Sequence, residues 1–278
     1  MALYTMKEIL KDAQDRHYGA GYFNAINMEM VRAYIEAAEE VQSPIIIGTA
    51  EGLLNYAPFE WIVPLMLDQA RRAKVPVAVH LDHAYHFEVL MQALRAGIGS
   101  IMYDGSRGSH EDNVRVSCEV ARIAHCMGVG VECELGSVGG LEDENGKVDD
   151  MVYTSPDDAC EFVEQTGIDF LAVSIGTAHG VYKSTPKLDI PRLKEIRAAV
   201  NTPLVLHGGS GLSDEDFRNT IDGGIAKINV YTDIIMAGKR ALLENNDKSY
   251  TDMCQCVQNA MKDATLVKLK LFGSAGKA

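Results

Sequence analysis

Eight short apolar segments rich in β-branched residues recur along the 278-residue chain, and this repetition constrains the fold more than any other feature. Each segment is followed by a polar or glycine-containing turn and then by a stretch with the apolar spacing of a helix, such as MEMVRAYIEAAEEV. The expected strands are residues 20–25, 44–49, 76–81, 99–103, 129–135, 169–175, 203–207 and 225–230.

Alternating strands and helices indicate parallel strands joined by right-handed crossovers. Eight such units within about 250 residues match the α/β class of the (β/α)₈ TIM barrel. A doubly wound open sheet is the alternative, but it would usually carry a glycine-rich nucleotide loop after its first strand, where this chain has FNAINMEM. We therefore expect residues 1–278 to form a single barrel catalytic domain. The mostly helical C-terminal extension beyond about residue 245 should pack outside the barrel or on a neighbouring subunit.

The net charge of −13 argues against nucleic acids and anionic membranes as partners, although a small anionic substrate stays open. The six cysteines form no CxxC pair and suggest reduced thiols in a cytosolic protein. The first residues read as an amphipathic helix rather than a signal peptide, and no apolar run approaches the length of a membrane span. We expect a cytoplasmic protein.

Unusual polar residues gather where the expected strands end, which is where a barrel of this type places its active site. They are Asn24, Thr49, Asp82, His83, Asp104, Glu132, Glu134, His179, His207, Asn229 and Thr232.

Three histidines stand out among these residues: His83, His179 and His207. Imidazoles brought to one rim match the three-ligand arrangement of a catalytic divalent metal, with one position open for substrate. Each alone could be a hydrogen-bonded structural histidine, but the three together favour a metal site. His80 lies two residues before Asp82, so it should point the same way and support or pack against the site.

The carboxylates suggest acid/base and metal chemistry. Asp82 adjoins His83, where it can exchange a proton with a substrate hydroxyl. Glu132 and Glu134 share one strand face, and two carboxylates pointing into a barrel need pairing or a cation. Glu134, nearer the strand end, is the candidate auxiliary metal ligand, with a hydrogen-bonded structural pair as the alternative. Asp104 is a candidate for an accessory metal.

Two loops suggest where a substrate binds. The glycines of HGGSGLSDEDF, with Ser210 among them, lead directly into a helix, and closely spaced backbone N–H groups at a helix N-terminus favour phosphate. NVYTD follows the last strand, and these two loops commonly hold phosphate in barrels. The long acidic loop 136–154 could be a mobile lid that carries a catalytic carboxylate, or a solvated surface loop. A metal beside a phosphate suits polarisation of a carbonyl on a phosphorylated sugar, by a lyase or by an isomerase.

Six segments, HLDHAYHFE, MYDGS, ECELGSVGGLED, GTAHGVYK, PLVLHGGSGL and AKINVYTD, together resemble the class II, zinc-dependent ketose-bisphosphate aldolases of the tagatose- and fructose-bisphosphate type. The resemblance runs in order from YFNAINMEM to KLFGS, nearly the whole chain. It implies reversible cleavage of a ketose phosphate to dihydroxyacetone phosphate and an aldehyde. It also implies a homodimer or homotetramer.

The same resemblance assigns roles residue by residue. His83, His179 and His207 would bind Zn²⁺, which would polarise the C2 carbonyl and stabilise the enediolate. Asp82 would handle the proton of the C4 hydroxyl, and Glu142 the proton on the dihydroxyacetone-phosphate carbon. Glu134 and Asp104 match positions that hold metal in alternative or second sites. The expected substrate- and phosphate-binding residues, some of them near a monovalent cation, are Asn24, Thr49, Gly180, Lys183, Gly208, Gly209, Ser210, Asn229, Tyr231 and Thr232.

Some positions depart from the family pattern. Tyr231 replaces the aspartate or small residue that is usual there, and Glu51 adds a negative charge where a second phosphate would approach. No arginine stands out as an anchor for a C6 phosphate. The substrate therefore stays open between a ketose 1,6-bisphosphate and another ketose 1-phosphate with an unphosphorylated or modified aldehyde half.

Three other functions remain to be compared. A Schiff-base aldolase needs a lysine at a strand end, but segment 169–175 has none and Lys227 comes early in its strand. A metal-dependent sugar-phosphate isomerase or epimerase on the same barrel is the main alternative, and it would form one product rather than two. A non-catalytic binding barrel fits poorly with the presence of both Asp82 and Glu142.

Overall fold

The computed structural model describes residues 3–140, 152–180 and 186–278. Eight parallel strands close into a barrel in the order β1-β10-β9-β7-β5-β4-β3-β2. The barrel strands are β1 (Ala20–Asn24), β2 (Ile45–Ala50), β3 (Val77–Ala84), β4 (Ser100–Tyr103), β5 (Gly130–Leu135), β7 (Phe170–Val173), β9 (Leu204–Leu206) and β10 (Ile225–Asn229). Two short strands, β6 (Gly139–Gly140) and β8 (Ala178–His179), pair with each other outside the barrel.

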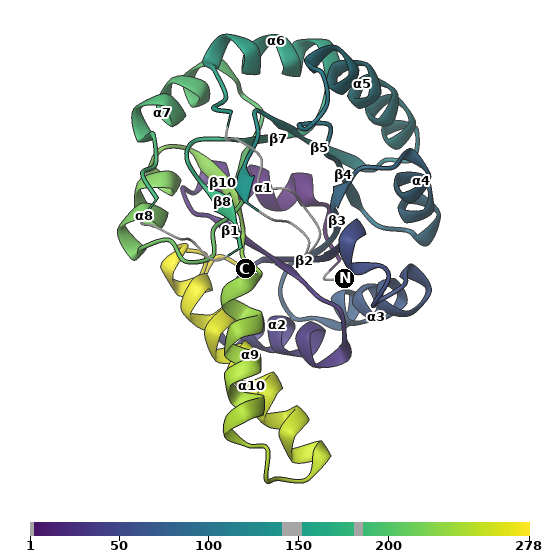
Figure 1. Ribbon diagram of the computed structural model, residues 1–278, viewed down its shortest axis with the longest axis vertical. Helices are drawn as coiled ribbons and strands as arrows, with labels where there is room; N and C mark the ends of the chain where they lie inside the picture. Colours follow the sequence, from purple (N-terminus) through teal and green to yellow (C-terminus); the bar gives the residue numbers. More distant parts are fainter. Residues whose placement is uncertain (1–2, 141–151, 181–185) are drawn as a thin grey trace.

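Helices surround the ring of strands, while α1 lies within the ring and the α9–α10 hairpin extends to one side (Figure 1). The helices are α1 (Met6–Asp15), α2 (Met28–Val41), the 3₁₀ turn η1 (Glu51–Leu53), α3 (Phe59–Arg72), α4 (Phe87–Ala96), α5 (His110–Cys126), α6 (Pro156–Thr166), α7 (Ile190–Ala199), α8 (Asp214–Asp222), α9 (Thr232–Glu244) and α10 (Tyr250–Leu271). Within these ranges, no helix is both long and apolar enough to cross a membrane.

Local signals in the sequence fix many helix ends. The side chains of Ser155 and Ser213 each accept a backbone N–H of the first turn of α6 and α8, which satisfies a donor that has no partner in the helix. Gly97 and Gly167 end α4 and α6 in the left-handed conformation that glycine adopts without steric cost.

The strands separate two apolar cores. The outer core lies between the strands and the surrounding helices, and it includes the outward side chains of β2 and β3 such as Ile47 and Leu81. The inner core fills the barrel near the strand starts, with residues such as Ile46, Met102 and Phe170. The helix α1 belongs to this inner core through the buried side chains Met6, Ile9, Leu10 and Ala13, so it closes the end of the barrel where the strands begin.

The C-terminal helices pack on the outside of the barrel. Along the α2–α10 contact, Gln258 Nε2 donates to both carboxylate oxygens of Glu36 at 3.1 Å, and Lys262 pairs with Glu40 at 2.6 Å. The chain end then returns to the end of α2, where the N–H of Gly276 donates to the carbonyl of Val41 at 2.8 Å.

The structure confirms the barrel and all eight expected strands, most within one or two residues of their expected ends. Two features differ from the sequence expectation. The strand β3 continues to Ala84, so His83 lies inside it rather than after it. The β6–β8 pair was not expected, because two-residue strands have no periodicity to detect.

The lack of space around Gly48 in β2 leads to a stability prediction. A Cβ on Gly48 would lie 2.0 Å from the His80 carbonyl oxygen and 2.7 Å from the Tyr22 hydroxyl. We expect Gly48→Ala to lower the free energy of unfolding by about 1–3 kcal/mol through overpacking, as measured by urea denaturation. Gly99→Ala is the matched control, because its nearest neighbour would be 3.8 Å away. Equal effects of the two substitutions would contradict this account.

Candidate active site

Three histidine rings converge at the carboxyl end of the barrel. The ring centroid of His83 lies 5.0 Å from that of His179 and 4.5 Å from that of His207, and the His179–His207 distance is 5.8 Å. His83 comes from β3, His179 from β8, and His207 from the residue after β9. Residues far apart in the sequence thus present one nitrogen each within 4.8 Å of one another. The structure brings together the three histidines that the sequence analysis grouped.

An irregularity in β3 lets two consecutive residues serve the site. The register between β3 and β4 shifts between Leu81 and Ala84, and His83 has a φ of 31°. In a regular strand, Asp82 and His83 would point to opposite faces. A bulge of this kind re-aims a side chain, so both residues reach the interior. A positive φ is uncommon for a residue other than glycine, and strained backbone of this kind is found repeatedly at functional sites.

Two of the three imidazoles are oriented by carboxylates. His83 Nδ1 lies 2.9 Å from Asp104 Oδ2, and His207 Nε2 lies 2.9 Å from Glu132 Oε1. A carboxylate accepts the proton of the nitrogen it faces, which leaves the lone pair on the opposite nitrogen. Those opposite nitrogens, His83 Nε2 and His207 Nδ1, face each other 2.6 Å apart. The carboxylates therefore direct these two nitrogens toward one point.

Glu134 and Asp104 lie beside this point with different electrostatic surroundings. Burial raises the pKa of Glu134 to about 8, and the nearby Asp104 carboxylate adds to the shift. Burial alone would raise the pKa of Asp104, but hydrogen bonds from His83 and Ser106 outweigh it and hold this pKa below its usual range. Glu134 Oε2 is buried 3.7 Å from His207 Nδ1 and has no hydrogen-bond partner among the described residues.

The donor set fits a divalent metal. His83, Asp104 and Glu134 form a second group of ligand atoms within 4.8 Å that shares His83 with the histidine group. Imidazole nitrogens with carboxylate oxygens nearby suit Zn²⁺ and related ions. The unpartnered oxygen of Glu134 is also accounted for if a cation binds there, because a buried carboxylate oxygen without a partner is costly. These residues are therefore candidate metal ligands.

Asp82 is held by two amide side chains. Its Oδ2 accepts from Asn24 Nδ2 at 3.3 Å, and its Oδ1 accepts from Asn229 Nδ2 at 3.0 Å. Asn24 is fixed in turn by the hydroxyl of Tyr22, which donates to its Oδ1 at 2.6 Å. Asp82 is only 2% exposed, and this network orients its carboxylate beside the histidines. Such an orientation suits proton exchange with a bound hydroxyl group.

The glycine-rich turn after β9 lies next to the start of α9. Gly208 has a φ of 67°, and a Cβ there would lie 2.5 Å from the Ala178 carbonyl oxygen, so only glycine fits. Ser210 Oγ accepts the backbone N–H groups of Tyr231 and Asp233 at 3.3 Å and thereby caps α9, whose first residue is Thr232. This places the expected loop residues together at a helix N-terminus, which is a favourable setting for an anion.

The structure does not support every substrate contact that the sequence analysis expected. The N–H of Gly209 already donates to the Asn229 carbonyl at 3.1 Å. Thr49 pairs in register with Leu81, whose side chain lies in the outer core, so the Thr49 side chain is directed away from the barrel interior. Gly180 follows His179 with a φ of 87°. Glu142 and Lys183 lie outside the described residues.

Glu51 has a local structural role. Its Oε2 accepts the backbone N–H groups of Tyr85 and His86, at 2.8 and 3.2 Å, and its Oε1 pairs with the His86 ring. The Glu51 carboxylate thus fastens the turn after β3 to the end of β2. The hydrogen bond between the Glu51 carboxylate and the His86 ring raises the pKa of that imidazole.

The sequence analysis did not identify Tyr22 and Lys227 as neighbours of the site. Lys227 is fully buried, and its Nζ donates to Glu132 Oε2 at 2.8 Å and to Oε1 at 3.0 Å, with the Tyr22 ring 4.6 Å away. A lysine whose side chain points into the barrel needs an acidic side chain that also points inward from another strand. Glu132 supplies it, so the two unusual residues could have been paired from strand alternation.

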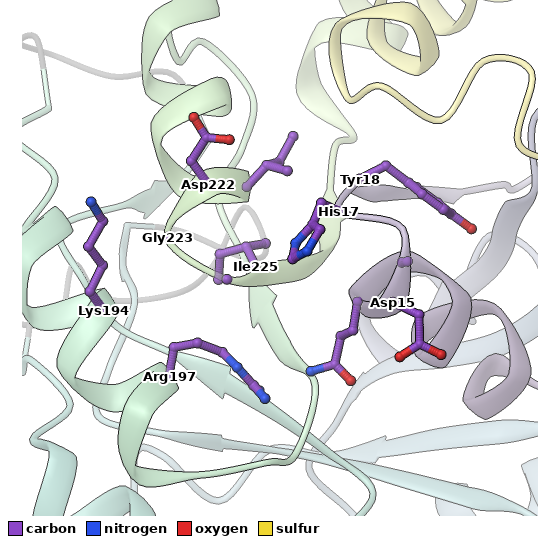
Figure 2. Close-up of a pocket in the computed structure, with 12 residues that line it drawn as sticks. Asp15, His17, Tyr18, Lys194, Arg197, Asp222, Gly223 and Ile225 are labelled. Atoms are coloured by element: carbon purple, nitrogen blue, oxygen red, sulfur yellow. The ribbon is translucent and has the colours of Figure 1, made fainter.

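A separate hollow of about 450 Å³ lies at the other end of the barrel, where β10 begins. Its lining includes Asp15, His17, Lys194, Arg197 and Asp222 (Figure 2). The Arg197 guanidinium donates to the carbonyls of the loop that precedes β9, so it braces the backbone. Positions at this face of a barrel usually serve stability, and the histidine cluster lies at the opposite end.

The buried imidazoles generate a pH prediction for the metal-free protein. Burial is the main cause that lowers the pKa values of His80 and His207 well below 6.5, so the unfolded chain binds protons that the folded chain does not. The free energy of unfolding should therefore fall as pH drops below about 6.5, by up to about 1.4 kcal/mol per pH unit for each histidine. Glu134, with its raised pKa, opposes part of this slope between 4.5 and about 8.

Urea denaturation of the chelator-treated protein across this range measures the slope. His110→Gln, at the exposed start of α5, is the control and should leave the slope unchanged. A stability that stays constant or rises with acidification would contradict the prediction.

Comparison with known proteins agrees with the barrel fold. A family model described as fructose-bisphosphate aldolase class-II matches residues 4–277. The protein YdjI of Escherichia coli (strain K12) is 43% identical over 267 residues, which cover 96% of each chain. The crystal structure of the YdjI aldolase superimposes with a TM-score of 0.92 at 41% identity and covers 99% of each chain.

A fructose-bisphosphate aldolase of Staphylococcus epidermidis is 40% identical over 286 residues, covering 100% of each chain. The family match and these relatives extend over nearly all of the sequence, including every strand that carries a residue of the histidine cluster. The chain therefore belongs to the class II fructose-bisphosphate aldolase family, a family of lyases.

Proposed function

We propose that this protein is a zinc-dependent aldolase that cleaves a ketose 1-phosphate or ketose 1,6-bisphosphate to dihydroxyacetone phosphate and an aldehyde. The observation that carries the proposal is the convergence of His83, His179 and His207 beside the buried carboxylate of Asp82. The family acts on phosphorylated sugars, which supports the substrate class.

The three histidines would hold the metal, with Glu134 and Asp104 as further candidate ligands. Burial lowers the pKa of His179 to about 3, with the neighbouring His83 adding to the shift, so this imidazole stays neutral and able to bind a cation. A divalent cation bound there supplies a Lewis acid that polarises the substrate carbonyl and balances the negative charge that develops on it.

Asp82 would take the proton from the substrate C4 hydroxyl as the carbon–carbon bond breaks. The amide groups of Asn24 and Asn229 donate to its two oxygens, so the carboxylate presents a fixed lone pair instead of rotating. The second proton transfer, at the dihydroxyacetone-phosphate carbon, we assign to Glu142 in the loop after β5 on the sequence pattern.

The substrate phosphate would bind at the start of α9, near Gly208, Gly209 and Ser210, with Gly180, Lys183, Asn229 and Thr232 as further contacts. The positive end of the α9 dipole favours an anion there. A monovalent cation beside this phosphate remains part of the proposal. Tyr231 is half-buried next to Asn229, so its side chain would shape the pocket for the aldehyde half of the substrate.

A Schiff-base route does not use the lysine that the barrel offers. Lys227 is buried below the histidines with its Nζ bonded to both oxygens of Glu132. An ammonium held in this way is not a free nucleophile. We also propose that the protein is cytoplasmic and acts as a homodimer or homotetramer.

Metal removal tests the proposed reaction directly. We expect the protein to release dihydroxyacetone phosphate from at least one member of a panel of ketose 1-phosphates, with and without a C6 phosphate. EDTA should abolish the release and Zn²⁺ should restore it, because the three imidazoles each present a nitrogen within 4.8 Å of the others, where one cation can bind them all. A folded, zinc-loaded protein that yields one isomerised product instead of two fragments would favour the isomerase.

Asp82→Ala tests the proton-transfer assignment. We expect kcat to fall about 10²–10⁴-fold, because general acid–base catalysis typically contributes this much, while bound zinc per chain stays unchanged. Thr49→Ser is the control: its side chain faces the outer core, so kcat should stay near that of the wild type. Near-normal turnover in Asp82→Ala would show that another group moves this proton.

A further inference from the structure

Charged and polar side chains form a continuous chain through the barrel beneath the three histidines. Lys227 Nζ donates to both oxygens of Glu132, at 2.8 and 3.0 Å, and Glu132 Oε1 lies 2.9 Å from His207 Nε2. All three side chains have zero solvent exposure. They come from β10, β5 and the end of β9, so the contacts cross the barrel interior instead of following one strand.

The position of Glu132 determines which nitrogen of His207 is protonated. An ionised carboxylate can only accept, so His207 must carry its proton on Nε2 and leave the lone pair on Nδ1. Nδ1 is the nitrogen that faces His83 Nε2 at 2.6 Å. This is the tautomer that a metal ligand needs on that side.

One neighbour favours the opposite tautomer. Asn229 Nδ2 lies 3.3 Å from His207 Nε2 and could donate to it if Nδ1 carried the proton. That contact is longer than the Glu132 contact and joins two neutral groups. A hydrogen bond to an ionised group is roughly twice as strong as a neutral one, so Glu132 determines the outcome.

Lys227 holds the Glu132 carboxylate in the orientation that this arrangement requires. Its Nζ donates to both carboxylate oxygens, so the carboxylate cannot rotate away from His207 Nε2. A buried carboxylate also needs a counter-charge nearby. The bidentate ammonium contact, with the Tyr22 ring 4.6 Å from Nζ, supplies the counter-charge.

We infer that Lys227 and Glu132 are positioning residues that fix the tautomer and orientation of His207 and thereby prepare it to bind the catalytic metal. The inference rests on the proposed function, in which His207 is a ligand. The carboxylates behind the two ligands are supported differently. Asp104 accepts from the N–H and the hydroxyl of Ser106, at 3.0 and 2.7 Å, whereas Glu132 accepts from the positively charged ammonium of Lys227.

Two variants test this inference through metal binding. Glu132→Gln places an amide N–H₂ against the Lys227 ammonium or against His207, and Lys227→Met removes the charge with little change of volume. We expect each to raise the Kd for Zn²⁺, measured by chelator competition, about 10–100-fold, the usual effect of losing such a partner. The visible spectrum of the Co²⁺-loaded protein should also change, because the ligand field at His207 changes.

Asp169→Asn is the matched control at the other end of the barrel. The Asp169 carboxylate also pairs with a lysine and a histidine, Lys7 at 2.9 Å and His125 at 2.8 Å. This substitution should leave the Zn²⁺ affinity and the Co²⁺ spectrum unchanged. If Lys227 acts through Glu132, the double variant Glu132→Gln/Lys227→Met should bind Zn²⁺ about as weakly as Glu132→Gln alone.

Wild-type Zn²⁺ affinity and Co²⁺ spectra in both single variants would overturn the inference. If the variants do not fold, ¹⁵N NMR of the metal-free wild-type protein labelled at histidine decides: a proton on His207 Nε2 supports it, and a proton on Nδ1 overturns it. These measurements do not depend on turnover. A wild type that binds Zn²⁺ but cleaves no ketose phosphate would overturn the proposed function and leave this inference standing.

Discussion

Closure of the sheet is the constraint on which the rest of the molecule depends. The parallel pairing of β1 with β10 joins the first and last barrel strands, so none of the eight barrel strands keeps a free edge. Closure also turns every second side chain toward a common interior. Polar residues there must satisfy one another across the barrel, which is why Lys227, Glu132, His207 and Asp82 are linked by hydrogen bonds or by shared partners.

Within this frame, the site depends on one departure from regular strand geometry. In a strand with regular alternation of side chains, only one of Asp82 and His83 would point into the barrel. The bulge in β3 delivers both, at the expense of a left-handed histidine backbone. A carboxylate and a metal-binding imidazole can thus be adjacent in the sequence and also adjacent in the site.

Much of the fold and of the site was predictable from the sequence. Periodicity located all eight strands, and strand ends located the histidines, because both signals are local and repeat along the chain. The position of His83 inside β3 was not predictable, since the bulge arises from pairing with β4. Thr49 was grouped with the site because it lies at a strand end, but register with Leu81 directs its side chain outward. The Lys227–Glu132 contact joins residues 95 positions apart. Strand alternation indicates that both side chains point into the barrel, but it does not give the distance between them.

The position of α1 has a consequence for how the chain is made. This helix and β1 are synthesised before the other barrel strands, yet the apolar face of α1 packs among inward side chains from strands as late as β10. The second edge of β1 finds its partner only when residues 225–229 have been synthesised. The pairing of β1 must therefore wait for the last barrel strand, and contacts so distant in sequence make folding slow. During synthesis, the apolar face of α1 and the open edge of β1 are the surfaces that a chaperone would need to cover.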